Sequence, residues 1–118
     1  MNGDPPPGNS PGNSPGNSPG NSTEAEAAAA TARRVAKICN QRGLHARAAA
    51  RFVKTVHQFD ADIWVRKNGT TVSGRSIMGL MMLAAGSGTE LEISAAGREA
   101  DEAVATLANL VECKFDED

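Results

Sequence analysis

The stretch RGLHARAAARFV, from Arg42 to Val53, combines residue types that suit phosphate chemistry. His45 directly precedes a segment with helical spacing, and Arg47 follows it two residues later. The N-terminus of a helix carries unpaired N–H groups and a partial positive charge, so it attracts anions and disfavours a permanent imidazolium. A neutral imidazole can attack a phosphoryl donor and later act as a leaving group. One hypothesis is therefore that His45 carries a phosphoryl group.

The surroundings of His45 favour phosphate over other chemistries. No cysteine, aspartate or glutamate lies close to it in the sequence, so it shows neither a metal-ligand spacing nor a triad signature. Gly43 permits a sharp turn, and the small residues Ala46 and Ala48 leave the helix end unobstructed. The N–H groups of residues 46–48 and the Arg47 guanidinium would stabilise a bound phosphate by charge-assisted hydrogen bonds. These residues alone leave open the alternative that His45 lies at the start of a helix and has no chemical role.

Basic residues gather around His45 although the formal net charge of the chain is −2. No acidic residue lies between Arg33 and Lys54, and seven basic residues do: Arg33, Arg34, Lys37, Arg42, Arg47, Arg51 and Lys54. Such a region would steer phosphate or an acidic partner towards the histidine; the alternative is a solvated charged face. Aromatic residues make up only 3% of the chain, so it offers no stacking platform and we expect no nucleic-acid partner.

The chain divides into a tail and one domain. GNSP repeats fill the region from Gly8 to Ser22, and all six prolines lie in the first 22 residues. Because this tract has almost nothing apolar to bury, we expect residues 1–30 to be a disordered low-complexity tail, which enters the domain through a short helix starting near Thr23. Residues 31–118 are enough for one modest hydrophobic core.

The hydrophobic pattern of the domain predicts an α+β fold. The expected order is strand, helix, strand, strand, helix, strand, helix, with Asn68-Gly69 as a hairpin turn. The helices are expected from Ala46 to Phe59, from Ser76 to Leu83 and from about Glu99 to Lys114, with Ser76 as an N-cap. Such elements would form an open-faced β-sandwich, a four-stranded antiparallel sheet with three helices on one face.

Several classes of protein are disfavoured by what the sequence lacks. The two cysteines, Cys39 and Cys113, have no metal or redox spacing, so we expect no metal and no cofactor. No apolar run is long enough to span a membrane, and the N-terminus lacks the pattern of a signal peptide. We therefore expect a cytoplasmic protein that makes no contact with membranes.

Two separate segments, GLHARAAARFV and SGRSIMGLMMLAAGSGTELEISA, resemble HPr, the family of histidine-containing phosphocarriers of the bacterial phosphoenolpyruvate-dependent phosphotransferase system. The resemblance extends from Arg33 to Phe115 and implies the β-α-β-β-α-β-α open-faced sandwich. It implies that His45 is phosphorylated on Nδ1 by enzyme I and that Arg47 stabilises the phosphate during transfer. Ala48 is a departure, because the family often has proline there; the change gives up rigidity but adds an N–H.

The resemblance also implies a regulatory site and a docking surface. Ser76 matches the serine that an ATP-dependent HPr kinase/phosphorylase phosphorylates in some bacteria, although its N-cap role would by itself explain a serine there. The short helix after Ser76 has more apolar residues than it can bury, and exposed methionines suit several partners. The residues expected to contact partners are Ile77, Met78, Met81 and Arg51.

The leading hypothesis is a monomeric phosphocarrier that passes a phosphoryl group from enzyme I to enzyme IIA domains, and not a free-standing enzyme. The alternative is a non-carrier regulatory adaptor whose phosphorylation state is read by its binding partners. A small nucleic-acid-binding domain is a third hypothesis, against which the lack of aromatic residues argues. The acceptor pathway, whether sugar uptake, nitrogen regulation or another, stays open.

Overall fold

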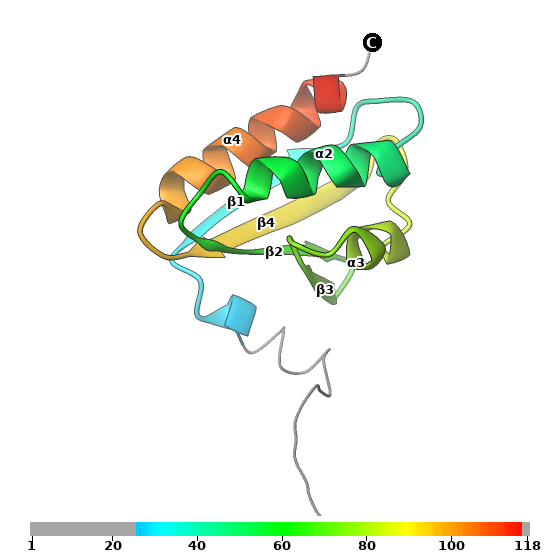
Figure 1. The fold of residues 1–118 in the computed structure, drawn as a ribbon. Helices are drawn as coiled ribbons and strands as arrows, with labels where there is room; N and C mark the ends of the chain where they lie inside the picture. The colour runs from blue at the N-terminus through cyan, green and yellow to red at the C-terminus, as the bar shows by residue number, and fades with distance from the viewer. Residues whose placement is uncertain (1–25, 117–118) are drawn as a thin grey trace, which may run out of the picture.

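The structure is a computed structural model that describes residues 26–116. Its four strands form one antiparallel sheet in the order β1-β4-β2-β3, which confirms the sheet predicted from the sequence (Figure 1). The strands are β1 (Ala32–Lys37), β2 (Asp62–Lys67), β3 (Thr70–Ser73) and β4 (Glu90–Ala96). Strands β4 and β2 are central, while β1 and β3 form the two edges.

Helices cover one face of this sheet and bury its apolar residues. The helices are α2 (Ala46–Val56), α3 (Ile77–Met82) and α4 (Ala100–Glu112), followed by the 3-10 turn η1 (Lys114–Asp116). Figure 1 shows α2 and α4 lying side by side over the same face of the sheet. Phe52 from α2, Leu80 from α3 and Leu107 from α4 are fully buried in a single core cluster. Each such side chain contributes about 1.5–3 kcal/mol by leaving water.

Two helices end earlier than the sequence predicted. After α2 the N–H groups of Gln58 and Phe59 donate to carbonyls three residues back, so the chain tightens into 3-10 turns instead of continuing the helix. After α4 the backbone turns at Phe115, which has a φ of 54° and a fully buried side chain. The end of the described chain is therefore anchored in the core.

A further helical turn lies on the opposite face of the sheet. Residues 26–28 are helical and lie below the sheet in Figure 1, away from α2 and α4. The sequence predicted a short helix here but placed three helices on one face and did not foresee where this one would lie. Residues 1–25 of the expected disordered tail, and residues 117–118, lie outside the described part of the chain.

Candidate functional site

His45 is the N-cap of α2, as its place before the apolar helical spacing predicted. Its backbone is extended, with φ −80° and ψ −179°, and its carbonyl accepts a hydrogen bond from the N–H of Ala49 over 2.8 Å. The imidazole does not cap its own helix and is partly exposed. The side chain can therefore be reached by a partner at the positive end of the helix.

The loop that carries His45 is fixed by a close backbone approach. Gly43 has a φ of +69°, and a Cβ placed there would lie 2.5 Å from the carbonyl oxygen of Ala85. The N–H of Leu44 donates to that same oxygen over 2.8 Å, and Asn40 Nδ2 donates to the carbonyl of Gly43 over 2.8 Å. Glycine is required at position 43 both by its backbone angle and by the absence of space. The entry to α2 is consequently held against the segment that follows α3.

The first turn of α2 offers three backbone donors. The N–H groups of Ala46, Arg47 and Ala48 precede the first intrahelical hydrogen bond, which is the one from Ala49 to His45. This turn contains no acidic residue. The side chain of Ala48 is buried, so at this end of the helix it contributes only its N–H. The arrangement has the donors and the positive potential that a phosphoryl group requires.

A basic groove runs along the exposed side of α2. Arg47, Arg51 and Lys54 line it together with Ala50, and its volume is about 240 Å³. The spacing of these cations at i, i+4 and i+7 sets like charges beside one another, which costs an isolated helix a few tenths of a kcal/mol per pair, roughly 0.2–0.5. The groove thus continues the positive potential of the helix end, and it suits an acidic partner.

Ser76 is the N-cap of α3, as predicted. Its Oγ accepts a hydrogen bond from the N–H of Gly79 over 2.9 Å. A Cβ on Gly79 would lie 3.1 Å from that oxygen, so glycine lets the cap approach closely. Ser76 is partly exposed, and its hydroxyl is therefore both a structural cap and a group that another protein could reach.

The exposed apolar patch on α3 is larger than the sequence predicted. Leu80 is fully buried, whereas Ile77, Met78 and Met81, the residues expected to contact partners, are exposed. Met82, which we did not single out, is the most exposed of the set at 78%, against 71% for Met78. Its spacing of four residues from Met78 places both on one side of the helix, and this signal could have revealed it.

The sequence also missed the residue that holds the C-terminal end of α3. Lys67 Nζ, at the end of β2, donates to the carbonyls of Leu83 over 2.9 Å and Ala84 over 3.2 Å. A cation at this position satisfies carbonyls that have no partner within the helix, and it interacts favourably with the negative end of the helix dipole. Together with the bond from Leu44 to Ala85, it fixes residues 83–85 from two sides. In Figure 1, α3 lies against the N-terminal half of α2.

Within residues 26–116, no three histidine, cysteine or acidic side chains lie close enough to hold a metal ion. Cys39 and Cys113 are free, exposed thiols. None of the helices in the described part of the chain has the length and apolar character needed to cross a membrane.

Fold and site together define a small α+β domain that presents a histidine at a helix N-terminus, beside a basic groove and an exposed methionine patch. The family model described as "PTS HPr component phosphorylation site" matches residues 32–113. The chain is 47% identical to the phosphocarrier protein HPr of Neisseria meningitidis serogroup A over 81 residues, which are 69% of this chain and 91% of that protein. It is 40% identical over 80 residues to the phosphocarrier protein NPr of Shewanella violacea, covering 68% of this chain and 88% of that one.

A solved structure agrees with these matches. The crystal structure of HPr-C-His from Thermoanaerobacter tengcongensis superposes with a TM-score of 0.71 at 41% identity, covering 75% of this chain and 99% of that one. The chain belongs to the HPr family, the phosphocarrier proteins of the phosphotransferase system.

Proposed function

We propose that this chain accepts a phosphoryl group from phospho-enzyme I on Nδ1 of His45 and passes it to acceptor domains of the enzyme IIA type. The observation that carries the proposal is the N-cap position of His45, directly before three backbone donors and Arg47. Membership of a phosphocarrier family supports it. The proposed setting is the cytoplasm, and the proposed acting form is a monomer.

The chemistry requires one nucleophile and a site for negative charge. The lone pair of Nδ1 attacks the phosphorus atom, and the bond from phosphorus to the donor breaks, with its electrons leaving on the donor group. The N–H groups of the first turn and the guanidinium of Arg47 stabilise the phosphoryl oxygens. The reverse displacement hands the group to the acceptor. No small substrate is turned over, so the protein acts as a carrier and not as an independent enzyme.

Partners are proposed to dock on the two surfaces that flank His45. The basic groove on α2, which includes Arg51, would meet an acidic partner surface, and the patch of Ile77, Met78, Met81 and Met82 would supply apolar contact. Met side chains repack easily, so one patch can serve both a donor and an acceptor. Because α2 and α3 are in contact, both surfaces can be covered at the same time.

Ser76 is proposed as a regulatory site for an HPr kinase/phosphorylase. A phosphate on Oγ would stay at the N-terminus of α3, where its charge is favourable, so the fold would be retained. It would instead add negative charge at the start of α3, directly before the apolar patch that begins at Ile77. Docking of an acidic partner such as enzyme I would then weaken.

The proposal is tested by incubating the chain with enzyme I and phosphoenolpyruvate and recording its intact mass. We expect a gain of one acid-labile phosphate, lost in His45→Ala and retained in the matched control His57→Ala, whose residue is exposed at the far end of α2. A phosphate that persists in His45→Ala would overturn the assignment of the residue. No gain with an enzyme I that phosphorylates another HPr would favour the regulatory adaptor.

A further inference from the structure

The outer face of the sheet, which points away from the core, carries a buried tryptophan. The strand register aligns Trp64 of β2 with Ser94 of β4 and Ser73 of β3, and aligns Ser94 with Arg33 of β1. These residues alternate with core residues such as Ile63 and therefore point to the opposite side. Trp64 lies outside the core cluster and is nevertheless only 7% exposed. In an open-faced sandwich the outer face of the sheet has no covering layer of helices, yet at Trp64 this face is shielded from solvent.

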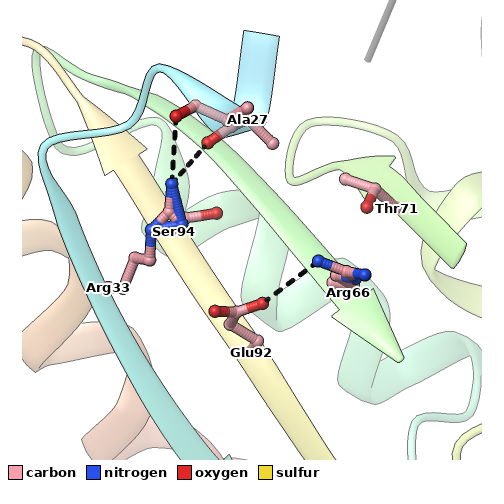
Figure 2. A pocket seen from close by; sticks show the side chains of 7 residues that line it. Ala27, Arg33, Arg66, Thr71, Glu92 and Ser94 are labelled. Atoms are coloured by element: carbon pink, nitrogen blue, oxygen red, sulfur yellow. Dashed lines mark hydrogen bonds and ion pairs between the residues drawn. The ribbon is translucent and has the colours of Figure 1, made fainter. Parts of the chain in front are cut away.

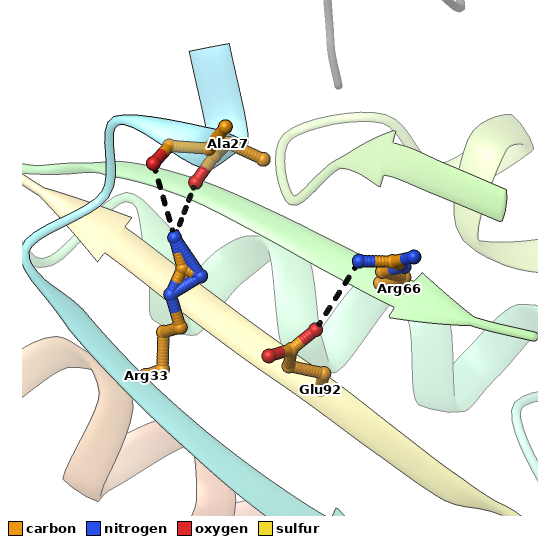
Figure 3. Close-up of polar contacts among 5 residues, drawn as sticks. Ala27, Arg33, Arg66 and Glu92 are labelled. Atoms are coloured by element: carbon orange, nitrogen blue, oxygen red, sulfur yellow. Dashed lines mark hydrogen bonds and ion pairs between the residues drawn. The ribbon is translucent and has the colours of Figure 1, made fainter. Parts of the chain in front are cut away.

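The segment before β1 lies over this face. One nitrogen of the Arg33 guanidinium donates to the carbonyls of Ala27 over 3.1 Å and Ala28 over 3.2 Å (Figure 3). The N–H of Thr31 donates to the carbonyl of Ala95 over 2.9 Å and extends the pairing of β1. Arg33 thus supplies a cation to the carbonyl end of the helical turn at residues 26–28. Arg33 therefore anchors the helical turn, and the Thr31 bond fixes the point at which the chain enters β1.

Two hollows lie between the segment and the sheet. The smaller, of about 130 Å³, has Ala27 and Ala28 on one side and Arg66, Thr71, Glu92 and Ser94 on the other (Figure 2). The larger, of about 440 Å³, has Glu26 and Ala29 on one side and Trp64, Ser73 and Ala96 among the residues of the other. Ala27 and Ala30 are half-buried, so small side chains allow the segment to approach the sheet. The surroundings of Trp64 therefore include this segment.

The segment is additional to the part shared with relatives. The 81 residues matched to the Neisseria meningitidis protein make up 91% of it, so that relative is too short to have a counterpart of all 31 residues that precede the family match. The family match begins at residue 32, after the segment. Because residues 26–30 lie outside the family match, we expect the matched domain to fold without them.

We propose that residues 26–30 form a strap that binds the outer face of the sheet, and that this face is a second interaction surface whose occupant is the chain's own alanine-rich segment. The kind of ligand it fits is a short helical turn of small residues whose carbonyls reach Arg33. The surface lies across the sheet from His45. The proposal therefore stands apart from the proposed function and does not depend on it.

Trp64 provides the test, because it is the only tryptophan and the chain has no tyrosine. A variant lacking residues 1–30 keeps Thr31 and its bond to Ala95. We expect its emission maximum to move to longer wavelength and its quenching by acrylamide to increase. A synthetic peptide of residues 23–31, added in excess, should reverse both changes. Far-UV circular dichroism of the variant checks that the remaining helices are intact.

A point substitution in the full chain tests the anchor separately. Arg33→Ala should shift the emission and increase quenching in the same direction as the deletion. The matched control is Arg34→Ala, which removes an exposed arginine of the same strand that points to the other side of the sheet. Unchanged fluorescence in the deletion variant would overturn the strap, and failure of the peptide to bind would overturn the interaction surface. Unchanged fluorescence in Arg33→Ala would overturn the role of Arg33 as its anchor.

Discussion

The N–H of Leu44 donates to the carbonyl oxygen of Ala85 over 2.8 Å and so joins the loop before His45 to the segment that follows α3. Lys67 holds the carbonyls of the two preceding residues, Leu83 and Ala84. One backbone bond and one lysine side chain therefore hold the C-terminal end of α3, and together they limit how α3 can move relative to the loop that carries His45. A partner that recognises both elements meets a preformed surface, which lowers the cost of binding.

The contact at Gly43 predicts a large loss of stability on substitution. In Gly43→Ala the new Cβ meets the Ala85 carbonyl and the residue must keep a φ of +69°. We expect the free energy of unfolding, from urea denaturation, to fall by about 2 kcal/mol or more. The control is Gly69→Ala, where φ is +84° but nothing lies within 4 Å, and where the backbone term of about 1 kcal/mol acts alone. Equal losses in the two variants would contradict the steric argument.

Arg47 is predicted to act in transfer and not in folding. Because its side chain is exposed, Arg47→Ala should leave the unfolding free energy within about 0.5 kcal/mol of the parent. The rate of phosphorylation by enzyme I should fall roughly a hundredfold, the scale of removing one charge-stabilising donor. Rapid-quench intact mass measures it. The control is Arg98→Ala, at another exposed arginine, which should keep the parent rate. A normal rate in Arg47→Ala would contradict the prediction and show that the helix N–H groups are sufficient for phosphoryl transfer.

Two substitutions of Ser76 should distinguish its role as a helix cap from the effect of a negative charge at this position. Ser76→Ala removes the acceptor for the Gly79 N–H and should cost about 1 kcal/mol of stability, measured by denaturation. Ser76→Asp retains a capping oxygen and should preserve stability, but it adds a negative charge beside the exposed apolar patch of α3. Its affinity for enzyme I, measured by calorimetry, should fall below that of Ser76→Ala. The opposite order of affinities would count against regulation by charge.

The methionine patch is predicted to bind partners without stabilising the fold. Met78→Ser and Met82→Ser remove side chains that are 71% and 78% exposed, so the unfolding free energy should change by no more than about 0.5 kcal/mol. Affinity for enzyme I or a IIA domain, measured by calorimetry, should decrease in both variants. The control is Val35→Ser, which also replaces an exposed apolar side chain by serine but does so on the outer face, where Val35 is 56% exposed. This variant should bind the partner normally. Leu80→Ala, in the core, should instead cost about 2–5 kcal/mol of stability.

Local sequence signals predicted those parts of the structure that depend on neighbouring residues. The Asn68-Gly69 turn has positive φ at both residues, 49° and 84°, as this hairpin type requires, and Ser76 caps its helix. The contacts of Lys67 with α3 and of Arg33 with residues 27 and 28 were not predicted. A lysine beside a turn or an arginine in a strand has no preferred partner until the sheet brings distant segments together. Trp64 was expected to be a strand residue that packs at the sheet, which its place in β2 and its burial confirm, but the segment that lies over it was not predicted.

The route by which the chain enters β1 also determines how the domain can be displayed. Residues 26–30 run along the face of the sheet opposite α2, so a group attached at residue 26 would start on the side remote from the helix that His45 precedes (Figure 1). A fluorophore, a solid support or a fused domain attached there would leave His45 accessible from the other side. By the same geometry, several copies could be arrayed through residue 26 with every His45 on the side away from the support.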